Sequence, residues 1–123
     1  MEIDTKYLKL ELKPLSELNI YYNIPGEPLD KKIRSESGVY ILCEDNGNVL
    51  YIGQSKIVRN RISSHTSFNS RSASWVDKKR VKIIYVLYCD NKLCQLIEQA
   101  YKYFLDSEFN DKGHATEFNG MGV

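Results

Sequence analysis

Two short apolar runs joined by an Asn-Gly turn constrain the fold of this chain more than any other feature. Residues 38–43 and 49–53 are rich in β-branched and aromatic side chains, and residues 44–48 between them are polar and contain the step Asn46-Gly47. An Asn-Gly step between two such runs favours the tight turn of a β-hairpin. The chain is therefore expected to contain an antiparallel strand pair against which the rest of the fold packs.

The pattern downstream of the hairpin predicts a helix, a loop and a third strand. Residues 56–65 carry apolar side chains at spacings near one helical turn, and the Ser-rich residues 63–74 are expected to form a loop. Residues 81–89 are mostly apolar, which predicts a strand in the middle of the sheet.

A second helix follows, and it has the clearest pattern in the chain. Asp90 or Asn91 can cap it. Its apolar residues recur at i, i+3, i+4, i+7, i+8, i+11 and i+12, from Leu93 to Leu105, and Glu98 flanks this stripe. The order β, β, α, β, α predicts an α+β fold, with a small three-stranded antiparallel or mixed sheet flanked by helices.

The chain has 123 residues, which fits one domain. We expect a core at residues 36–112, a short N-terminal extension at 1–35 and a tail at 113–123. Alternating leucines predict a short strand in the extension, at Leu8, Leu10 and Leu12.

The three cysteines follow no disulfide framework, which argues for free thiols and an intracellular, reducing compartment. No apolar run is long enough to span a bilayer, and the N-terminus lacks the pattern of a signal peptide. We therefore expect a cytoplasmic protein, free or associated with the nucleoid, with no membrane partner.

The net charge of +1 conceals an uneven distribution. Residues 54–83 contain eight Lys and Arg residues and one Asp, a net charge of +7, so the rest of the chain sums to −6. A basic segment of this kind suits a face that meets a polyanion, although a solvated lysine-rich loop explains the charge equally well.

Five residues can carry chemistry if the predicted elements bring them together. Tyr40 and Tyr51 lie on the two hairpin strands, where pairing can place them on one face of the sheet. Arg61 and His65 are four residues apart on one helical face, and guanidinium and imidazole groups suit phosphoryl transfer. Glu98 could hold a hard cation such as Mg²⁺. Taken singly, each of these residues is more simply a sheet aromatic or a solvated side chain.

Together these residues resemble the GIY-YIG nuclease family. Its first signature appears as Gly38-Val39-Tyr40 and its second as Tyr51-Ile52-Gly53. The family's helix arginine corresponds to Arg61, with Arg59 as a competing candidate two residues off the family spacing. Three further family positions correspond to His65, to Glu98 as the metal-binding glutamate, and to Asn110 as the asparagine that braces the site.

The resemblance implies a metal-dependent endonuclease. Glu98 would hold one Mg²⁺ or Mn²⁺, Arg61 would stabilise charge on the phosphate, and Tyr51 or His65 would take the proton of the attacking water, with Tyr40 positioning that water. A tyrosine with an ordinary pKa near 10 is a poor base at neutral pH, so the choice between Tyr51 and His65 stays open here.

Further residues are expected to contact the nucleic acid through close backbone approach or positive charge. They are Gly53, Gln54, Lys56, Arg59, Arg71, Lys78, Lys79 and Arg80. We expect the partner to be double-stranded or branched DNA, with specificity supplied by a second copy of the chain, by a partner protein, or by the loops and the extension. Two alternatives are a nucleic-acid-binding module of the same fold that does not cut, and a structural protein that docks through its extension.

Overall fold

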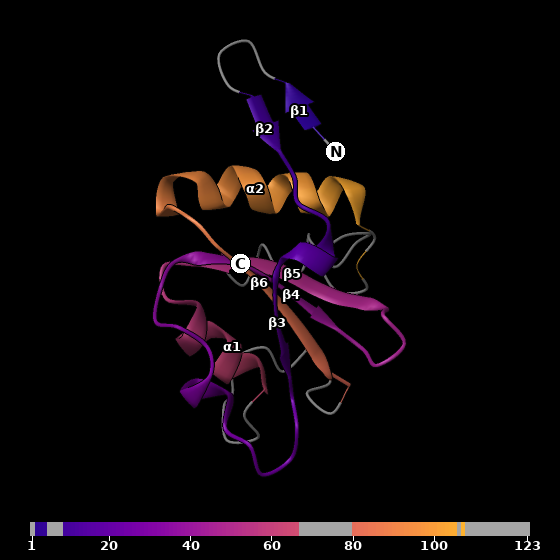
Figure 1. The fold of residues 1–123 in the computed structure, drawn as a ribbon, viewed down its shortest axis with the longest axis vertical. Coiled ribbons are helices and arrows are strands. Elements are labelled where there is room, and N and C mark those ends of the chain that lie inside the picture. The colour runs from indigo at the N-terminus through magenta and orange to yellow at the C-terminus, as the bar shows by residue number, and fades with distance from the viewer. Residues whose placement is uncertain (1, 5–8, 67–79, 106, 108–123) are drawn as a thin grey trace, which may run out of the picture.

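The computed structural model describes residues 2–4, 9–66, 80–105 and 107, and gives the backbone alone for 2–4, 9–11, 65 and 66 (Figure 1). In chain order the elements are β1 (Glu2–Asp4), β2 (Lys9–Glu11), the 3₁₀ turn η1 (Leu15–Glu17), β3 (Asn19–Tyr22), the 3₁₀ turn η2 (Leu29–Lys31), β4 (Gly38–Cys43), β5 (Val49–Ser55), α1 (Val58–Thr66), β6 (Ile83–Tyr88) and α2 (Asn91–Phe104).

An antiparallel four-stranded sheet, ordered β3-β6-β4-β5, organises the fold. The predicted α+β class and the interior position of β6 are confirmed. The prediction of three strands was wrong by one, because β3 from the N-terminal extension pairs with β6 from Asn19 to Tyr22. A four-residue strand whose side chains are mostly exposed carries too little alternation to be recognised from sequence.

The sheet separates two apolar cores, with α1 and η2 on one face and α2 on the other (Figure 1). The α1 face buries Tyr40, Leu42 and Tyr51, whereas the α2 face buries Val39 and Ile41. This division follows from the alternation of side chains along β4. The β5 strand forms one edge of the sheet and contacts both helices, so this edge can bring together side chains from both faces.

Gly38, the first residue of β4, is required by the close approach of β6. A Cβ atom at this position would lie 2.6 Å from the carbonyl oxygen of Leu87, which is backbone and cannot move aside cheaply. Gly47 serves a different need, since it takes φ of +90° in the hairpin turn, a conformation that L side chains rarely adopt. The predicted hairpin is confirmed.

The first helix differs from the predicted one at both ends, and it begins at Val58 rather than at residue 56. The first helix runs to Thr66, so residues 63–66, expected to be loop, are helical. Residues 67–74 of that predicted loop lie outside the described residues. The second helix is capped by Asp90, whose side chain accepts a hydrogen bond from the backbone N–H of Lys92 at 2.8 Å.

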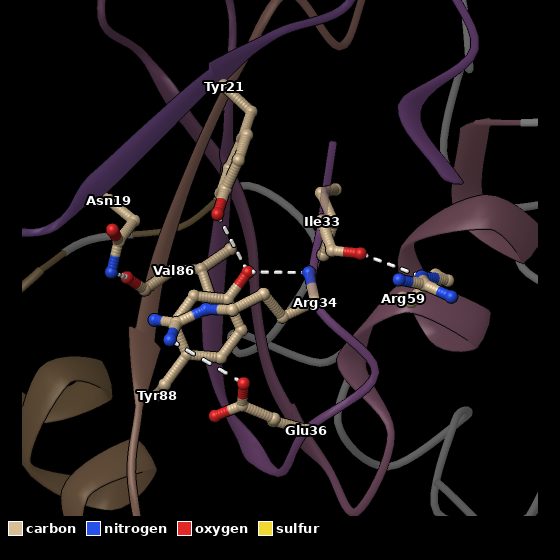
Figure 2. Close-up of polar contacts among 8 residues, drawn as sticks. All are labelled: Asn19, Tyr21, Ile33, Arg34, Glu36, Arg59, Val86 and Tyr88. Atoms are coloured by element: carbon tan, nitrogen blue, oxygen red, sulfur yellow. Dashed lines mark hydrogen bonds and ion pairs between the residues drawn. The ribbon is translucent and has the colours of Figure 1, made fainter. Parts of the chain in front are cut away.

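The described part of the predicted extension packs against the rest of the chain. Leu29 and Ile33 lie in the core beneath α1. The side chain of Arg59 on α1 donates a hydrogen bond from Nε to the backbone oxygen of Ile33 at 2.7 Å (Figure 2). The segment before β4 therefore supports the helix that carries Arg61.

Among the described residues, no helix is both long and apolar enough to cross a bilayer. The three cysteines are free thiols: Cys43 and Cys94 are buried, and Cys89 is partly buried with its Sγ 3.1 Å from that of Cys94.

Candidate active site

Tyr40 and Tyr51 form a buried pair next to the β5 edge. The hairpin register pairs Tyr40 with Gly53 and Tyr51 with Leu42, so the two tyrosines are diagonal neighbours on the α1 face. Their ring centroids are 6.0 Å apart and tilted by 35°, and their hydroxyl groups hydrogen-bond each other. The prediction that hairpin pairing brings these phenols together is confirmed.

Gly53 allows this pair to form. A Cβ atom on Gly53 would lie 2.4 Å from the hydroxyl oxygen of Tyr40 and 2.8 Å from the ring of Tyr51. The Tyr40 phenol therefore occupies the space where any other residue would place a side chain. The glycine of the second signature is required by the tyrosine of the first, which explains physically why the two tripeptides occur together.

Arg61 lies on α1 with an exposed side chain, and its charge acts on both phenols. Arg59, the competing candidate, uses its Nε to bind the backbone of Ile33 and is only partly exposed. Of the two arginines, Arg61 is therefore the one whose guanidinium acts on the tyrosine pair.

Glu98 approaches the same tyrosines from α2. Only 9% of its surface is exposed, and its Oε1 lies 3.6 Å from Nζ of Lys102, one helical turn further along. Burial raises the pKa of the Glu98 carboxyl, while the charge of Lys102 lowers it. The carboxylate is therefore held where water solvates it poorly and where a cation would stabilise its charged form.

Both phenols are protonated at neutral pH in this environment. Burial raises the pKa of Tyr40 well above its ordinary value, the nearby Tyr51 raises it further, and Arg61 opposes this increase. Burial also raises the pKa of Tyr51, the charge of Glu98 adds to the increase, and Arg61 again lowers it. The pair can therefore donate hydrogen bonds to an oxyanion.

An open hollow of about 440 Å³ lies beside Arg61, where β5 and α2 come together. Its lining also includes Gln54 and Lys56, two predicted nucleic-acid contacts, and Asn91 and Gln95 from α2. A phosphate or sugar can reach the guanidinium of Arg61 through this hollow.

Several predicted site residues lie elsewhere or beyond the described part of the chain. Arg80 donates two hydrogen bonds to the carboxylate of Glu44, both at 3.0 Å, beside the hairpin turn. His65 lies on α1, but its side chain is outside the described residues. Four other predicted residues are outside them entirely: Arg71, Lys78, Lys79 and Asn110.

The sequence prediction missed Lys102, Asn91 and Gln95. Lys102 could have been found from its i+4 spacing to Glu98 on a strongly amphipathic helix. Asn91 and Gln95 carry no such signal, because the hollow depends on how α2 crosses the end of β5.

The donor set suits a hard divalent cation that is completed by water and substrate. No group of three or more His, Cys, Asp and Glu side chains converges in the part of the chain that the structure describes. Mg²⁺ at phosphoryl-transfer sites commonly needs only one or two carboxylates, with water and phosphate oxygens as its other ligands. The poorly solvated carboxylate of Glu98 fits that requirement.

The comparisons with known proteins agree with this geometry. Among solved structures, the fold is similar to the GIY-YIG N-terminal endonuclease domain of UvrC from Thermotoga maritima, a tyrosine-to-phenylalanine point mutant bound to its catalytic divalent cation. The TM-score is 0.56 at 18% sequence identity, over 70% of this chain and 99% of that one, a likeness of fold. No curated protein matches the sequence. The profile of the GIY-YIG catalytic domain matches residues 36–110, more than half of the sequence, and the chain therefore belongs to the GIY-YIG catalytic-domain family.

Proposed function

We propose that this protein is a divalent-metal-dependent endonuclease that hydrolyses phosphodiester bonds in DNA. The observation that carries the proposal is the buried pair of Tyr40 and Tyr51, whose ring centroids are 6.0 Å apart and on which the charges of Arg61 from α1 and Glu98 from α2 both act. Membership of the GIY-YIG catalytic-domain family supports the same activity.

Arg61 is assigned to the phosphate. Its guanidinium can donate two hydrogen bonds to phosphate oxygens. In the hydrolysis a water oxygen bonds to phosphorus, the bond from phosphorus to the leaving sugar oxygen breaks, and negative charge builds on the remaining oxygens. The position of Arg61 beside the hollow suits stabilisation of that charge.

The tyrosine pair is assigned to the attacking water and to a phosphate oxygen. Tyr40 is protonated and almost fully buried, so it positions its partner through their hydrogen bond. The proton of the water passes to Tyr51 in its phenolate form or to His65 in its neutral form. Tyr51 has the better-supported position, because its phenol belongs to the pair on which Arg61 and Glu98 act, whereas an imidazole has the more suitable ordinary pKa.

Glu98 is the residue that would hold the metal, Mg²⁺ or Mn²⁺. A cation bound there supplies Lewis-acid stabilisation of the phosphate and the leaving oxygen. The similar domain of UvrC binds a catalytic divalent cation, which supports this assignment. Lys56 and Arg61, two of the basic residues that give residues 54–83 a net charge of +7, line the hollow and support a polyanionic substrate that reaches the site there.

The test is cleavage of plasmid, branched DNA and a matched RNA by the purified full chain, in Mg²⁺, in Mn²⁺ and in EDTA. Glu98→Gln keeps the shape of the side chain and removes its charge. Lys82→Ala is the matched control, because Lys82 is exposed and lies by the hairpin turn. We expect cutting of DNA that needs the metal, that is lost in Glu98→Gln and that persists in Lys82→Ala.

Two results would contradict the proposal. Cutting that persists in EDTA or in the Glu98→Gln variant would remove the metal role of Glu98. Tight DNA binding without cutting in any metal would support the alternative of a binding module of the same fold.

A further inference from the structure

A second hollow, of about 660 Å³, opens at the end of the sheet next to the active site. It is lined by Ser35, Glu36, Ser37, Lys56, Tyr88, Cys89 and Asn91. It shares Lys56 and Asn91 with the hollow beside Arg61. The two hollows therefore adjoin at these residues, and together they extend from Arg61 past Lys56 to Tyr88 as one composite surface. We call it the sheet-end groove.

Tyr88 lines the far end of this groove, and Arg34, which precedes the lining residue Ser35 and is not itself part of the lining, is stacked on the Tyr88 ring. The guanidinium carbon of Arg34 lies 3.9 Å from the centroid of the Tyr88 ring, and Nη1 lies 3.5 Å from a carboxylate oxygen of Glu36 (Figure 2). The Tyr88 hydroxyl accepts a hydrogen bond from the backbone N–H of Arg34 at 3.0 Å and lies 2.7 Å from the hydroxyl of Tyr21. These contacts hold the ring and the guanidinium in a fixed orientation.

The contacts of Tyr88 have a structural purpose, since they fasten β3 and the following segment to β6. That purpose does not explain why a planar cation remains in water, with 54% of the Arg34 side chain exposed. A fixed, flat and exposed guanidinium is a surface on which a nucleic-acid base can stack. Because the surface is already ordered, binding a base there costs little side-chain entropy.

The rest of the groove lining suits a nucleotide. Lys56 is exposed and lies between Arg61 and the stacked pair, where its ammonium can meet a phosphate. The carboxylate of Glu36 can accept hydrogen bonds from a base edge, and the amide of Asn91 can both accept and donate them. The volume lies within the range of sites that hold small ligands.

We propose that the sheet-end groove binds single-stranded nucleic acid flanking the scissile phosphate, with a base stacked on Arg34 and the intervening phosphate at Lys56. The inference rests on the proposed function, because it describes how that nuclease holds an unpaired part of its substrate. If the groove binds in this way, a substrate with a single-stranded segment beside the cut binds more tightly than a continuous duplex.

The test measures binding separately from cutting, by fluorescence anisotropy of the full chain in EDTA. One labelled oligonucleotide carries bases, and a second of the same length is abasic throughout. Arg34→Lys keeps the charge and removes the flat stacking surface, Lys56→Ala removes the phosphate contact, and Lys82→Ala at the other end of the sheet is the control. Thermal unfolding checks that each variant is folded.

We expect Arg34→Lys to weaken binding of the base-containing oligonucleotide by at least about fivefold and to change abasic binding by less than about twofold. Lys56→Ala should weaken both and reduce the salt dependence of binding by about one ion. Lys82→Ala should bind both strands as the unaltered protein does. A folded Arg34→Lys variant that binds both strands normally would overturn the proposal.

A second measurement decides the matter if Arg34→Lys does not fold. A 5-bromouracil base beside the cleavage position is irradiated in complex with the unaltered protein, and the cross-linked peptide is identified by mass spectrometry. Cross-links to residues 34–37 or 88–91 support the groove, and cross-links confined to other peptides overturn it.

The two proposals can fail independently. An Arg34 effect on binding in a protein that never cuts would leave the groove as a nucleic-acid site and remove the nuclease. Metal-dependent cutting with no Arg34 effect would leave the nuclease and remove the groove.

Discussion

Two tyrosine pairs lie in the same sheet, and each is accompanied by an arginine and a glutamate. The two groups differ in how deeply they are buried and in how their charges are paired. The pair of Tyr40 and Tyr51 is 1% and 6% exposed, and Arg61 and Glu98 reach it from opposite helices. We call these four residues the buried quartet after Tyr40, Tyr51 and Glu98, which are buried, whereas the side chain of Arg61 is exposed. At the other end of the groove, Tyr21 and Tyr88 are only partly buried and lie beside Arg34 and Glu36, which form the open quartet.

The difference lies in how the charges are paired. In the open quartet Arg34 pairs with Glu36, and both side chains are half-exposed, so their charges are largely neutralised by each other and by water. In the buried quartet, Glu98 pairs with Lys102 and, among the described residues, Arg61 has no ion-pair partner. The same four residue types can therefore serve for holding a ligand in one place and for chemistry in the other, because burial strengthens electrostatic effects.

Replacing the two arginines gives the largest expected contrast. Arg61→Ala should lower the cleavage rate at saturating DNA by about 10²–10³, the usual loss when one group that stabilises transition-state charge is removed. Arg34→Ala should instead raise the DNA concentration needed for half-maximal rate and spare the rate at saturation. Single-turnover cleavage over a range of protein concentrations separates these effects. Equal losses at saturation would show that the two quartets do not divide chemistry from binding.

The pH dependence of cleavage distinguishes the two candidate bases. A base must be deprotonated to act, and its deprotonated fraction falls about tenfold per pH unit below its pKa. Because burial raises the pKa of Tyr51, a rate limited by this phenol should keep rising with pH through pH 9. A rate limited by His65 should level off near pH 7, above the ordinary imidazole pKa of about 6.5. The measurement is single-turnover rate from pH 5.5 to 9 at constant metal concentration.

Removing one hydroxyl from each tyrosine pair should have different effects, on the cleavage rate in the buried quartet and on the free energy of unfolding in the open quartet. Tyr51→Phe should lower the rate at saturating DNA by at least about tenfold, because the proposed function assigns this hydroxyl to the attacking water. Tyr21→Phe should lower the free energy of unfolding by about 1 kcal/mol through loss of its contact with the Tyr88 hydroxyl. Chemical denaturation and single-turnover assays on both variants provide the comparison. An unaffected rate in Tyr51→Phe would remove Tyr51 from the reaction.

The buried quartet was predictable from sequence because local rules place most of it. The Asn-Gly turn predicts the hairpin, and helix spacing places Glu98 next to the apolar stripe of α2. The register that sets Tyr40 beside Tyr51 also depends on the shift between Leu42 and Cys43, which the turn does not predict. That Arg61 and Glu98 belong to one site was implied by the family resemblance. Spacing alone does not determine how two helices pack at one edge.

The open quartet escaped sequence analysis because its contacts are non-local. Tyr21 and Tyr88 are 67 residues apart in the chain and meet only because β3 pairs with β6. Arg34 reaches the Tyr88 ring from a segment without regular strand or helix, so no periodicity indicates its position. The strand β3 itself consists of four mostly exposed residues. Sequence patterns predict strands from alternation, and this one has almost none.

Glu98 and Glu36, the glutamates of the two quartets, provide the smallest expected contrast. It concerns the unfolding temperature of the protein without metal. Burial raises the pKa of Glu98, so the folded protein binds this proton more tightly than the unfolded chain does. The stabilising contribution is complete below the unfolded-state pKa, and it is lost as pH rises through the folded-state pKa. Glu98→Gln should therefore raise the unfolding temperature at pH 7 in EDTA, and this gain should shrink towards pH 4.

Glu36→Gln is the matched control, because its half-exposed ion pair with Arg34 contributes at most about 1 kcal/mol. It should leave the unfolding temperature nearly unchanged at both pH values. Added Mg²⁺ or Mn²⁺ should make the unfolding temperature of the unaltered protein higher than that of Glu98→Gln, because a cation that binds the carboxylate stabilises the unaltered protein and not the variant. A Glu98→Gln variant that is less stable in EDTA at pH 7 would mean that the attraction of Lys102 exceeds the cost of burial. Glu98 would then be a structural residue, and its assignment as metal ligand would lose its physical basis.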